Sequence, residues 1–217
     1  MDSYAKHMFS DAAKAEQDKA GTLAKYSHVY ETRLTGGLGD DEKAFIETRT
    51  SFYIASIVES GYPYIQHRGG PAGFLRVLDT DTIGFADYRG NKQFITQGNL
   101  ATNNKVSLIL MDYPRRARLK LIGEATMVGA DAQPELATTL SQEGQGPVER
   151  LMTISLTAMD WNCPQYILPR YTEDEIGEML APRMAEINGQ IDVLAGRLKE
   201  LGEDPASLLQ ASGEGQE

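Results

Sequence analysis

The sequence has few of the residues that build metal centres and disulfides. Its one cysteine, Cys163, excludes an internal disulfide, and its three histidines, His7, His28 and His67, lie far apart in the chain. Because a structural zinc site needs about four Cys or His ligands, no metal is predicted. No stretch approaches the roughly 18 apolar residues of a membrane helix, and the N-terminus lacks a signal-peptide pattern. We therefore expect a cytoplasmic protein without a membrane partner.

Basic charge is also scarce. The chain has 21 Lys and Arg against 31 Asp and Glu, a net charge of −10. Residues 173–204 carry −6 of this charge and residues 205–217 carry −2, so the body is nearly neutral and the tail is acidic. Nucleic-acid binding needs a net basic face, so no nucleic-acid partner is expected. With 41% hydrophobic residues, the 217-residue chain can form one domain with an extension.

Segments rich in β-forming residues recur along the middle of the chain with short connections. The expected strands cover residues 51–58, 62–67, 73–78, 82–86, 105–111, 117–127 and 148–159. Strands with this spacing favour a barrel over parallel βαβ units, so the fold class is mainly β, a β-barrel with flanking helices. Caps at Ser10, Asp40 and Asp131 predict helices over residues 11–20, 41–48 and 133–141, and Gly36 to Gly39 read as a flexible linker.

The C-terminal part shows a different periodicity. Seven apolar residues recur at spacings of 4, 3, 4, 3, 4 and 3, namely Leu180, Met184, Ile187, Ile191, Leu194, Leu198 and Leu201. This is an apolar seam of coiled-coil period, with Pro182 expected in the first turn of the helix. Asn188 and Gly189 weaken the helix, which should therefore pack on the barrel or on a partner chain. Residues 204–217 are expected to fray.

These patterns divide the chain into three segments. Residues 1–48 form an N-terminal helical segment packing on the barrel, residues 49–170 form the barrel, and residues 171–217 form a C-terminal helical extension with a disordered tail. The hairpin with its turn at Glu59-Ser60-Gly61 forms the first two strands of the expected barrel. Trp161 reads as a plug that closes the barrel, and Cys163 as a structural residue rather than a redox nucleophile.

The stretch from Gln66 to Val128 combines glycines, cations and strands. Its loop Asp87–Gln93 carries hydrogen-bonding groups between two strands. Five cations of the stretch could converge on one anion such as a phosphate: Arg76, Arg89, Lys92, Arg118 and Lys120. Arg118 and Lys120 have the same parity on their strand and share a face. The alternative is that these cations are solvated charges on strand edges.

Several motifs of this stretch resemble a known family. These motifs are Phe85-Ala86-Asp87-Tyr88 with Gly90-Asn91-Lys92, the strand ending Leu110-Met111-Asp112-Tyr113-Pro114, and the strand that starts at Arg118. In this order, over residues 41–168, the chain resembles the pyridoxamine 5'-phosphate oxidase-related FMN-binding proteins. It is most similar to the uncharacterised branch with the lead-in His67-Arg68-Gly69-Gly70-Pro71. The segment that reads pyridoxal phosphate in true oxidases is not found, which argues against vitamin B6 oxidase activity.

The resemblance implies a split β-barrel homodimer with an FMN at each subunit interface. Arg76 and Lys92 resemble the family's phosphate ligands, and Arg118 falls where the family has a polar residue reaching the flavin across the dimer. The loop residues Asp87, Tyr88, Asn91 and Gln93 resemble the ribityl contacts. The cofactor-binding residues that the resemblance implies are His67, Arg68, Leu75, Arg76, Asp87, Tyr88, Asn91, Lys92, Gln93, Arg118, Trp161 and Asn162.

Four functions are compatible with these patterns. The first is an FMN-dependent oxidoreductase acting on a small molecule, in which the flavin carries the redox chemistry and no catalytic acid or base can be named. The second is a flavin-binding carrier or sensor without turnover. The third is a haem-binding relative in which His67 ligates iron. The fourth is an assembly protein that works through the C-terminal seam.

Overall fold

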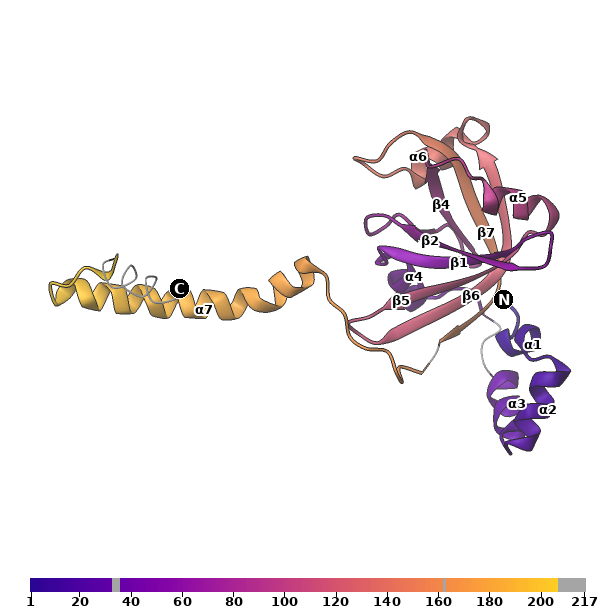
Figure 1. The fold of residues 1–217 in the computed structure, drawn as a ribbon, viewed down its shortest axis with the longest axis horizontal. Helices are drawn as coiled ribbons and strands as arrows, with labels where there is room; N and C mark the ends of the chain where they lie inside the picture. Colours follow the sequence, from indigo (N-terminus) through magenta and orange to yellow (C-terminus); the bar gives the residue numbers. More distant parts are fainter. Residues whose placement is uncertain (33–35, 162, 207–217) are drawn as a thin grey trace. The chain divides into compact units, whose positions relative to one another are not determined.

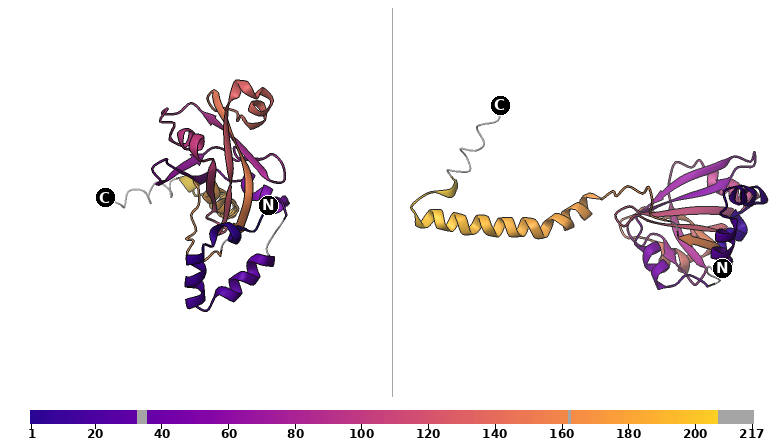
Figure 2. Two further views of the ribbon diagram at one scale, coloured as in Figure 1. Left: turned by 90° about the vertical axis from the view of Figure 1, so that its right-hand side faces the viewer. Right: turned by 90° about the horizontal axis from the view of Figure 1, so that it is seen from below.

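The chain folds into two compact units. The structure, a computed structural model, describes residues 1–32, 36–161 and 163–206 (Figures 1 and 2). The first unit is Met1–Leu168 and the second is Pro169–Glu217. All the strands described lie in the first unit, and the second contains one long helix, α7 (Glu173–Glu200). Among the described residues, no helix is long and apolar enough to cross a membrane.

Seven antiparallel strands form one sheet in the order β2-β1-β5-β6-β7-β4-β3. Their bounds are β1 Ser51–Ile57, β2 Pro63–Gly69, β3 Arg76–Val77, β4 Thr82–Tyr88, β5 Lys105–Asp112, β6 Ala117–Gly129 and β7 Val148–Trp161. The twisted sheet curls around the main core, and helices flank it (Figure 1). The prediction of a mainly β split barrel with flanking helices is confirmed.

Alternation along the strands explains where the core lies. Phe52, Ile54 and Ser56 of β1 are buried, whereas the residues between them are not. The neighbouring strand β5 alternates in the same way, with buried residues at every second position. Because successive side chains of a strand point to opposite faces, each of these strands turns one face to the core.

Strand β4 departs from this alternation, because all five residues from Ile83 to Asp87 are buried. Phe85 faces the main core, while Ala86 packs in a second cluster with Leu140 of α6 (Pro134–Leu140). Both faces of β4 are thus covered by hydrophobic side chains. This packing holds in place the end of the strand at Tyr88. The short 3-10 helix η1 (Ala130–Ala132) precedes α6. The observed α6 therefore starts at Pro134, one residue after the start predicted from the sequence.

The helices of the first unit lie outside the barrel strands (Figure 1). The N-terminal helices are α1 (Tyr4–Met8), α2 (Asp11–Lys19), α3 (Leu23–Thr32) and α4 (Asp40–Glu47), and α5 (Ile95–Thr102) follows β4. Ser10 caps α2 as predicted, since its hydroxyl accepts a hydrogen bond from the Ala13 N–H at 3.2 Å. Helix α4 begins at Asp40 itself, with Gly39 as the N-cap in place of Asp40. The sequence patterns did not indicate α1 and α3.

Trp161 packs at the end of the barrel against α4. Its indole N–H donates to Glu42 at 2.8 Å, and its ring meets the Phe45 ring edge-to-face at 4.7 Å between centroids. Cys163 is a free, exposed cysteine.

Three local expectations need correction. Gly37 is not a free linker, because an added side chain there would collide with Thr80, and the Leu38 N–H donates to the Thr80 carbonyl at 2.6 Å. The strand expected over residues 73–78 shrinks to β3, because the chain turns at Gly73, where φ is +85°. Pro182 lies inside α7 and not in its first turn, since the helix begins nine residues earlier.

Candidate functional site

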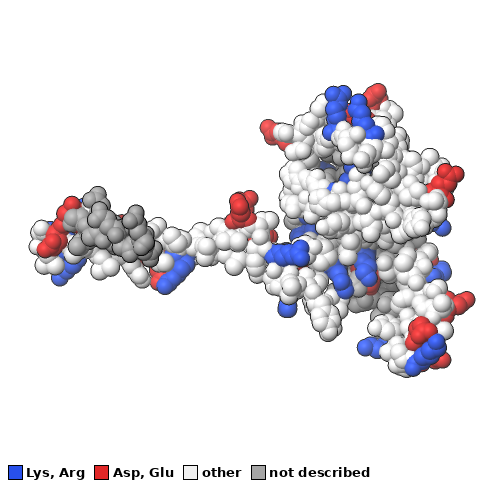
Figure 3. Space-filling view, in the orientation of Figure 1, with Lys and Arg blue, Asp and Glu red and all other residues white. Residues whose placement is uncertain are grey.

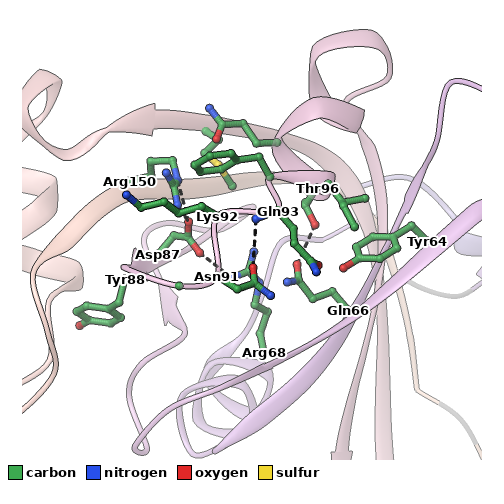
Figure 4. Close-up of a pocket in the computed structure, with 15 residues that line it drawn as sticks. Tyr64, Gln66, Arg68, Asp87, Tyr88, Asn91, Lys92, Gln93, Thr96 and Arg150 are labelled. Carbon is green, nitrogen blue, oxygen red and sulfur yellow. Dashed lines mark hydrogen bonds and ion pairs between the residues drawn. The ribbon is translucent and has the colours of Figure 1, made fainter.

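A cavity of about 110 Å³ lies where the ends of several strands meet α5 (Figure 4). Strand β2, the end of β4, the following loop, the start of α5 and single residues of β6 and β7 line it. Elements far apart in the sequence therefore contribute to one site. The lining residues are Tyr64, Gln66, Arg68, Asp87, Tyr88, Gly90, Asn91, Lys92, Gln93, Phe94, Ile95, Thr96, Gln97, Met127 and Arg150.

Strand β2 contributes three polar side chains through its pleat. Tyr64, Gln66 and Arg68 occupy alternate positions, so all three lie on the same face, toward the cavity. The Thr96 hydroxyl of α5 donates to the Gln66 side-chain oxygen at 2.8 Å. This bond fixes the Gln66 amide beside the first turn of α5.

Asp87, at the end of β4, is the electrostatic centre of the site. Its side chain is buried, with 8% of the residue exposed, and accepts from two guanidinium groups. Arg68 contacts one carboxylate oxygen at 2.6 Å, and Arg150 contacts the other through two nitrogens at 2.8 and 2.7 Å. Because a carboxylate can accept several charge-assisted bonds, one aspartate holds both arginines in place at the cavity.

The loop after β4 presents a third cation. Lys92 and Phe94 have positive φ angles of 60° and 53°, and the Asn91 side chain accepts from the Gln93 N–H at 3.2 Å. This turn brings Lys92 into the lining of the cavity (Figure 4). In the described part of the chain, no acidic group pairs with the Lys92 ammonium. The Arg150 guanidinium lies over the Phe94 ring at 5.0 Å from its centroid.

The N-terminus of α5 also faces the cavity. Phe94 is its N-cap and provides no side-chain hydrogen bond, so the first-turn N–H groups lack a side-chain cap. Three residues of this turn line the cavity, namely Ile95, Thr96 and Gln97. Uncapped N–H groups and the helix dipole both favour a negative charge at this end of a helix.

The charges of the cavity sum to a positive site. Among the lining residues, Arg68, Arg150 and Lys92 contribute three positive charges against the one negative charge of Asp87, and Glu149, outside the lining, also contacts Arg150 at 3.4 Å. In addition, the Arg68 Nε is buried and has no hydrogen-bond partner among the described residues. A compact anion with several oxygens, such as a phosphate group, would complete both the charge and the hydrogen bonds.

The structure brings half of the expected site residues together. Those that line the cavity are Arg68, Asp87, Tyr88, Asn91, Lys92 and Gln93. The Tyr88 ring points away from the cations in Figure 4, and its hydroxyl accepts from the Gln142 N–H at 2.7 Å. Tyr88 thus ties the site to the segment that follows α6.

The other expected residues lie elsewhere in the chain. His67 is exposed on the opposite face of β2, where its ring meets the Tyr53 ring at 5.4 Å. Leu75 is fully buried in the core, Arg76 is exposed on β3, and Trp161 packs on α4. Asn162 lies outside the described residues.

The five cations expected to converge on one anion do not do so within one chain. Lys92 lines the cavity, but Arg89 pairs with Glu149 at 3.1 Å and Lys120 lies 5.9 Å from the Tyr4 ring centroid. Arg118 lies nine residues along β6 from Met127 of the cavity, a separation of about 30 Å in an extended strand.

The sequence interpretation missed five polar residues of the cavity lining, namely Tyr64, Gln66, Thr96, Gln97 and Arg150. Gln66 and Tyr64 were detectable, because they lie on the strand predicted over residues 62–67 and have the same parity as Arg68, which follows it directly. Arg150 pairs across strands with Asp87, and this register is not visible in the local sequence. Thr96 belongs to a short helix whose position relative to Gln66 depends on the fold.

The comparisons with known proteins agree with this architecture. A family model described as "Pyridoxamine 5'-phosphate oxidase" matches residues 38–150, just over half of the chain. A comparison with curated proteins gives no significant match.

Several solved structures match part of this chain at low sequence identity. HupZ of Group A Streptococcus is 18% identical, with a TM-score of 0.48, over 62% of this chain and 99% of that one. A putative pyridoxamine 5'-phosphate oxidase from Lactobacillus delbrueckii is 15% identical, with a TM-score of 0.45, over 57% and 93%. An FMN-binding protein from Syntrophomonas wolfei is 12% identical, with a TM-score of 0.45, over 67% and 97%.

The fold and the cavity define a split-barrel protein with a positively charged cavity at the end of its barrel. The chain belongs to the pyridoxamine 5'-phosphate oxidase family.

Proposed function

We propose that this protein binds FMN and acts as a flavin-dependent oxidoreductase on a small molecule. The observation that carries the proposal is the convergence of Arg68, Arg150, Lys92 and the uncapped N-terminus of α5 on one small cavity. Two further findings support it, namely membership of the family and the name of the FMN-binding structure from Syntrophomonas wolfei.

The cavity suits the phosphate of FMN and not the whole cofactor. Pockets that enclose small-molecule ligands typically measure about 300–1,000 Å³, whereas this cavity measures about 110 Å³. In the proposal Arg68 and Lys92 bind the phosphate, Asp87 orients the arginines, and Gln66 and Tyr64 offer polar groups to the rest of the molecule. The flavin, when bound, supplies the electron-transfer chemistry.

Replacing Lys92 tests the phosphate site. Lys92→Ala removes an exposed cation without disturbing a core contact, so the protein should fold normally. Each charge-assisted bond contributes about 1.5–3 kcal/mol, so FMN affinity should fall about ten- to a hundredfold. Arg89→Ala is the matched control, because Arg89 belongs to the same loop but pairs with Glu149 outside the cavity lining.

The bound ligand itself gives the decisive measurement. Heating the purified protein should release FMN, identified by chromatography and by its visible spectrum. Release of FAD or haem would contradict the proposal, and so would equal FMN affinities of the Lys92→Ala and Arg89→Ala variants. Consumption of a reduced electron donor by the loaded protein distinguishes an oxidoreductase from a carrier or sensor without turnover.

We further propose that two chains share each flavin site in a homodimer. The small volume of the cavity leaves the ring system outside it, where a second subunit can cover the ring. Arg118 is too far along β6 to serve the cavity of its own chain, and its Nε is buried without a partner in the described residues. Arg118 therefore contributes, in the proposal, to the site of the second subunit.

Mixing two variants tests the shared site. In a heterodimer of one Lys92→Ala and one Arg118→Ala subunit, a shared arrangement puts both substitutions in one site and leaves the other site intact. Mixing the two variants should therefore restore up to one tight-binding FMN site per heterodimer. If each chain binds its own flavin, every site keeps one lesion and nothing is restored. Absence of recovery despite proven subunit exchange, or a monomer that binds FMN tightly, would exclude the shared site.

A further inference from the structure

Helix α7 is a well-formed helix with no buried residue among its 28 residues. Thr172 caps it: the Thr172 hydroxyl accepts from the Glu175 N–H at 3.2 Å, and the Glu175 carboxylate accepts from the Thr172 N–H at 2.8 Å. This reciprocal capping satisfies N–H groups at the start of the helix. The helix thus has a defined beginning of its own, and its apolar side chains are available for contact.

The apolar seam predicted from the sequence occupies one face of α7. Its residues fill heptad positions a (Met184, Ile191 and Leu198) and d (Leu180, Ile187, Leu194 and Leu201). Most are widely exposed, with 63% of Leu194 and 52% of Leu180 accessible. Figure 3 shows uncharged surface between scattered charged side chains along α7. Leucine at most d positions with isoleucine at an a position is typical of two-stranded coiled coils.

The face opposite the seam has almost nothing to bury. Heptad position f, the outermost position of a coiled coil, holds Pro182, Gly189 and Gly196 at a spacing of seven residues. Proline and glycine also weaken an isolated helix, which is marginal in water even when its residues favour it. The seam is therefore the face that can stabilise α7, and it needs an apolar surface to do so.

We propose that α7 pairs in parallel with the α7 of a second copy of this chain, forming a two-stranded coiled coil along the seam. The charges beside the seam favour this orientation. Position g carries Arg183 and Arg197. A parallel pair places Arg183 beside Asn188 of the second helix and Arg197 beside Gly202, which follows the end of that helix. An antiparallel pair that stacks Ile187 on Ile191 brings Arg183 of each helix beside Arg197 of the other, a repulsive contact made twice.

The pairing starts at Leu180. One heptad earlier the seam is interrupted, because position a is Gly177 and position d is Glu173. The acidic residues of the first turn, Glu173, Asp174 and Glu175, therefore lie before the paired segment, where two helices can diverge. From Leu180 to Leu201 the paired segment is about 30 Å long. This pairing does not depend on flavin binding, so it can be tested separately.

Disulfide cross-linking of the full chain tests both the pairing and its direction. In a background that carries Cys163→Ser, three single-cysteine variants are compared under mild oxidation: Leu194→Cys, Val193→Cys and Leu180→Cys. Val193 is the matched control, because it is adjacent to Leu194 and 73% exposed but lies off the seam at position c. In a parallel pair the d positions of the two helices face each other within reach of a disulfide.

The expected result is a covalent dimer with Leu194→Cys and with Leu180→Cys. The Val193→Cys variant should form no covalent dimer. No cross-linking at either d position would overturn the proposal, because the seam would then contact another surface or run antiparallel. Cross-linking that is equally strong with Val193→Cys would also overturn it, since the helices would be colliding without a fixed face.

A second pair of variants tests the seam without cysteine, because a cysteine substitution could itself disturb the helix. Leu194→Asp should lower the helical circular-dichroism signal of the full protein, because it places a charge in the seam. Val193→Asp, one position away, should leave the signal unchanged. Equal signals for the two variants would contradict a stabilising role of the seam.

Discussion

Replacing Asp87 by Asn removes the negative charge that holds Arg68 and Arg150 together. Asn keeps the shape of the side chain and one acceptor, but the two guanidinium groups lose their countercharge. Both arginine side chains are mostly buried, with 19% and 18% exposed, so water compensates this loss incompletely. The variant should have a lower free energy of unfolding. An anion bound in the cavity should raise this free energy more in the variant than in the unmodified protein.

The size of the effect follows from the contacts of Asp87. Hydrogen bonds to charged groups contribute about 1.5–3 kcal/mol each, and the Arg side chains are partly solvated, so we expect a loss of about 2–4 kcal/mol in the free energy of unfolding. For a chain of this length the melting temperature should fall by roughly 5–15 °C. A phosphate charge about 6 Å from the Asp87 carboxylate is repelled by about 3 kcal/mol at an effective dielectric constant near 20. Replacing Asp87 by Asn removes this repulsion, so phosphate should bind more favourably by about that amount.

Thermal unfolding with and without phosphate or FMN measures this linkage. The ligand should raise the melting temperature of Asp87→Asn more than that of the unmodified protein. Asp112→Asn is the control, because Asp112 is also buried between two arginines, Arg49 at 2.8 Å and Arg115 at 3.6 Å, but lies outside the cavity. If both variants gain equally from the ligand, the cavity is not the phosphate site.

Two further predictions concern the barrel. Truncation after Tyr171 should leave a cooperatively folding protein, because Met1–Leu168 is a compact unit that contains all the described strands; an insoluble product in solubility and calorimetry measurements would show that α7 covers core surface. Gly123→Ala should lower the free energy of unfolding by about 1–3 kcal/mol in urea titrations, because an added side chain would collide with the Ser155 carbonyl on β7. Gly129→Ala in the same strand meets nothing within 4 Å, so an equal loss there would refute this reasoning.

Local patterns in the sequence were enough to predict most of the barrel strands and the presence, though not the start, of the C-terminal helix. Strand β5 shows why: polar and apolar residues alternate from Lys105 to Leu108 and an apolar run continues to Met111, a pattern that favours a strand whatever the strand pairs with. The loop after β4 was also recognisable as a candidate anion site, because a turn rich in Asn, Gly and Lys presents N–H groups and a cation together.

Only the tertiary structure decided which cations meet. Arg150 lies 63 residues after Asp87 in the sequence, and the register between β4 and β7 sets them opposite each other. Arg76 and Arg118 had equally suggestive sequence contexts, yet the strand order carries them away from the cavity within one chain. The physical reason is that side-chain periodicity depends on neighbouring residues, whereas strand register depends on the packing of the entire sheet.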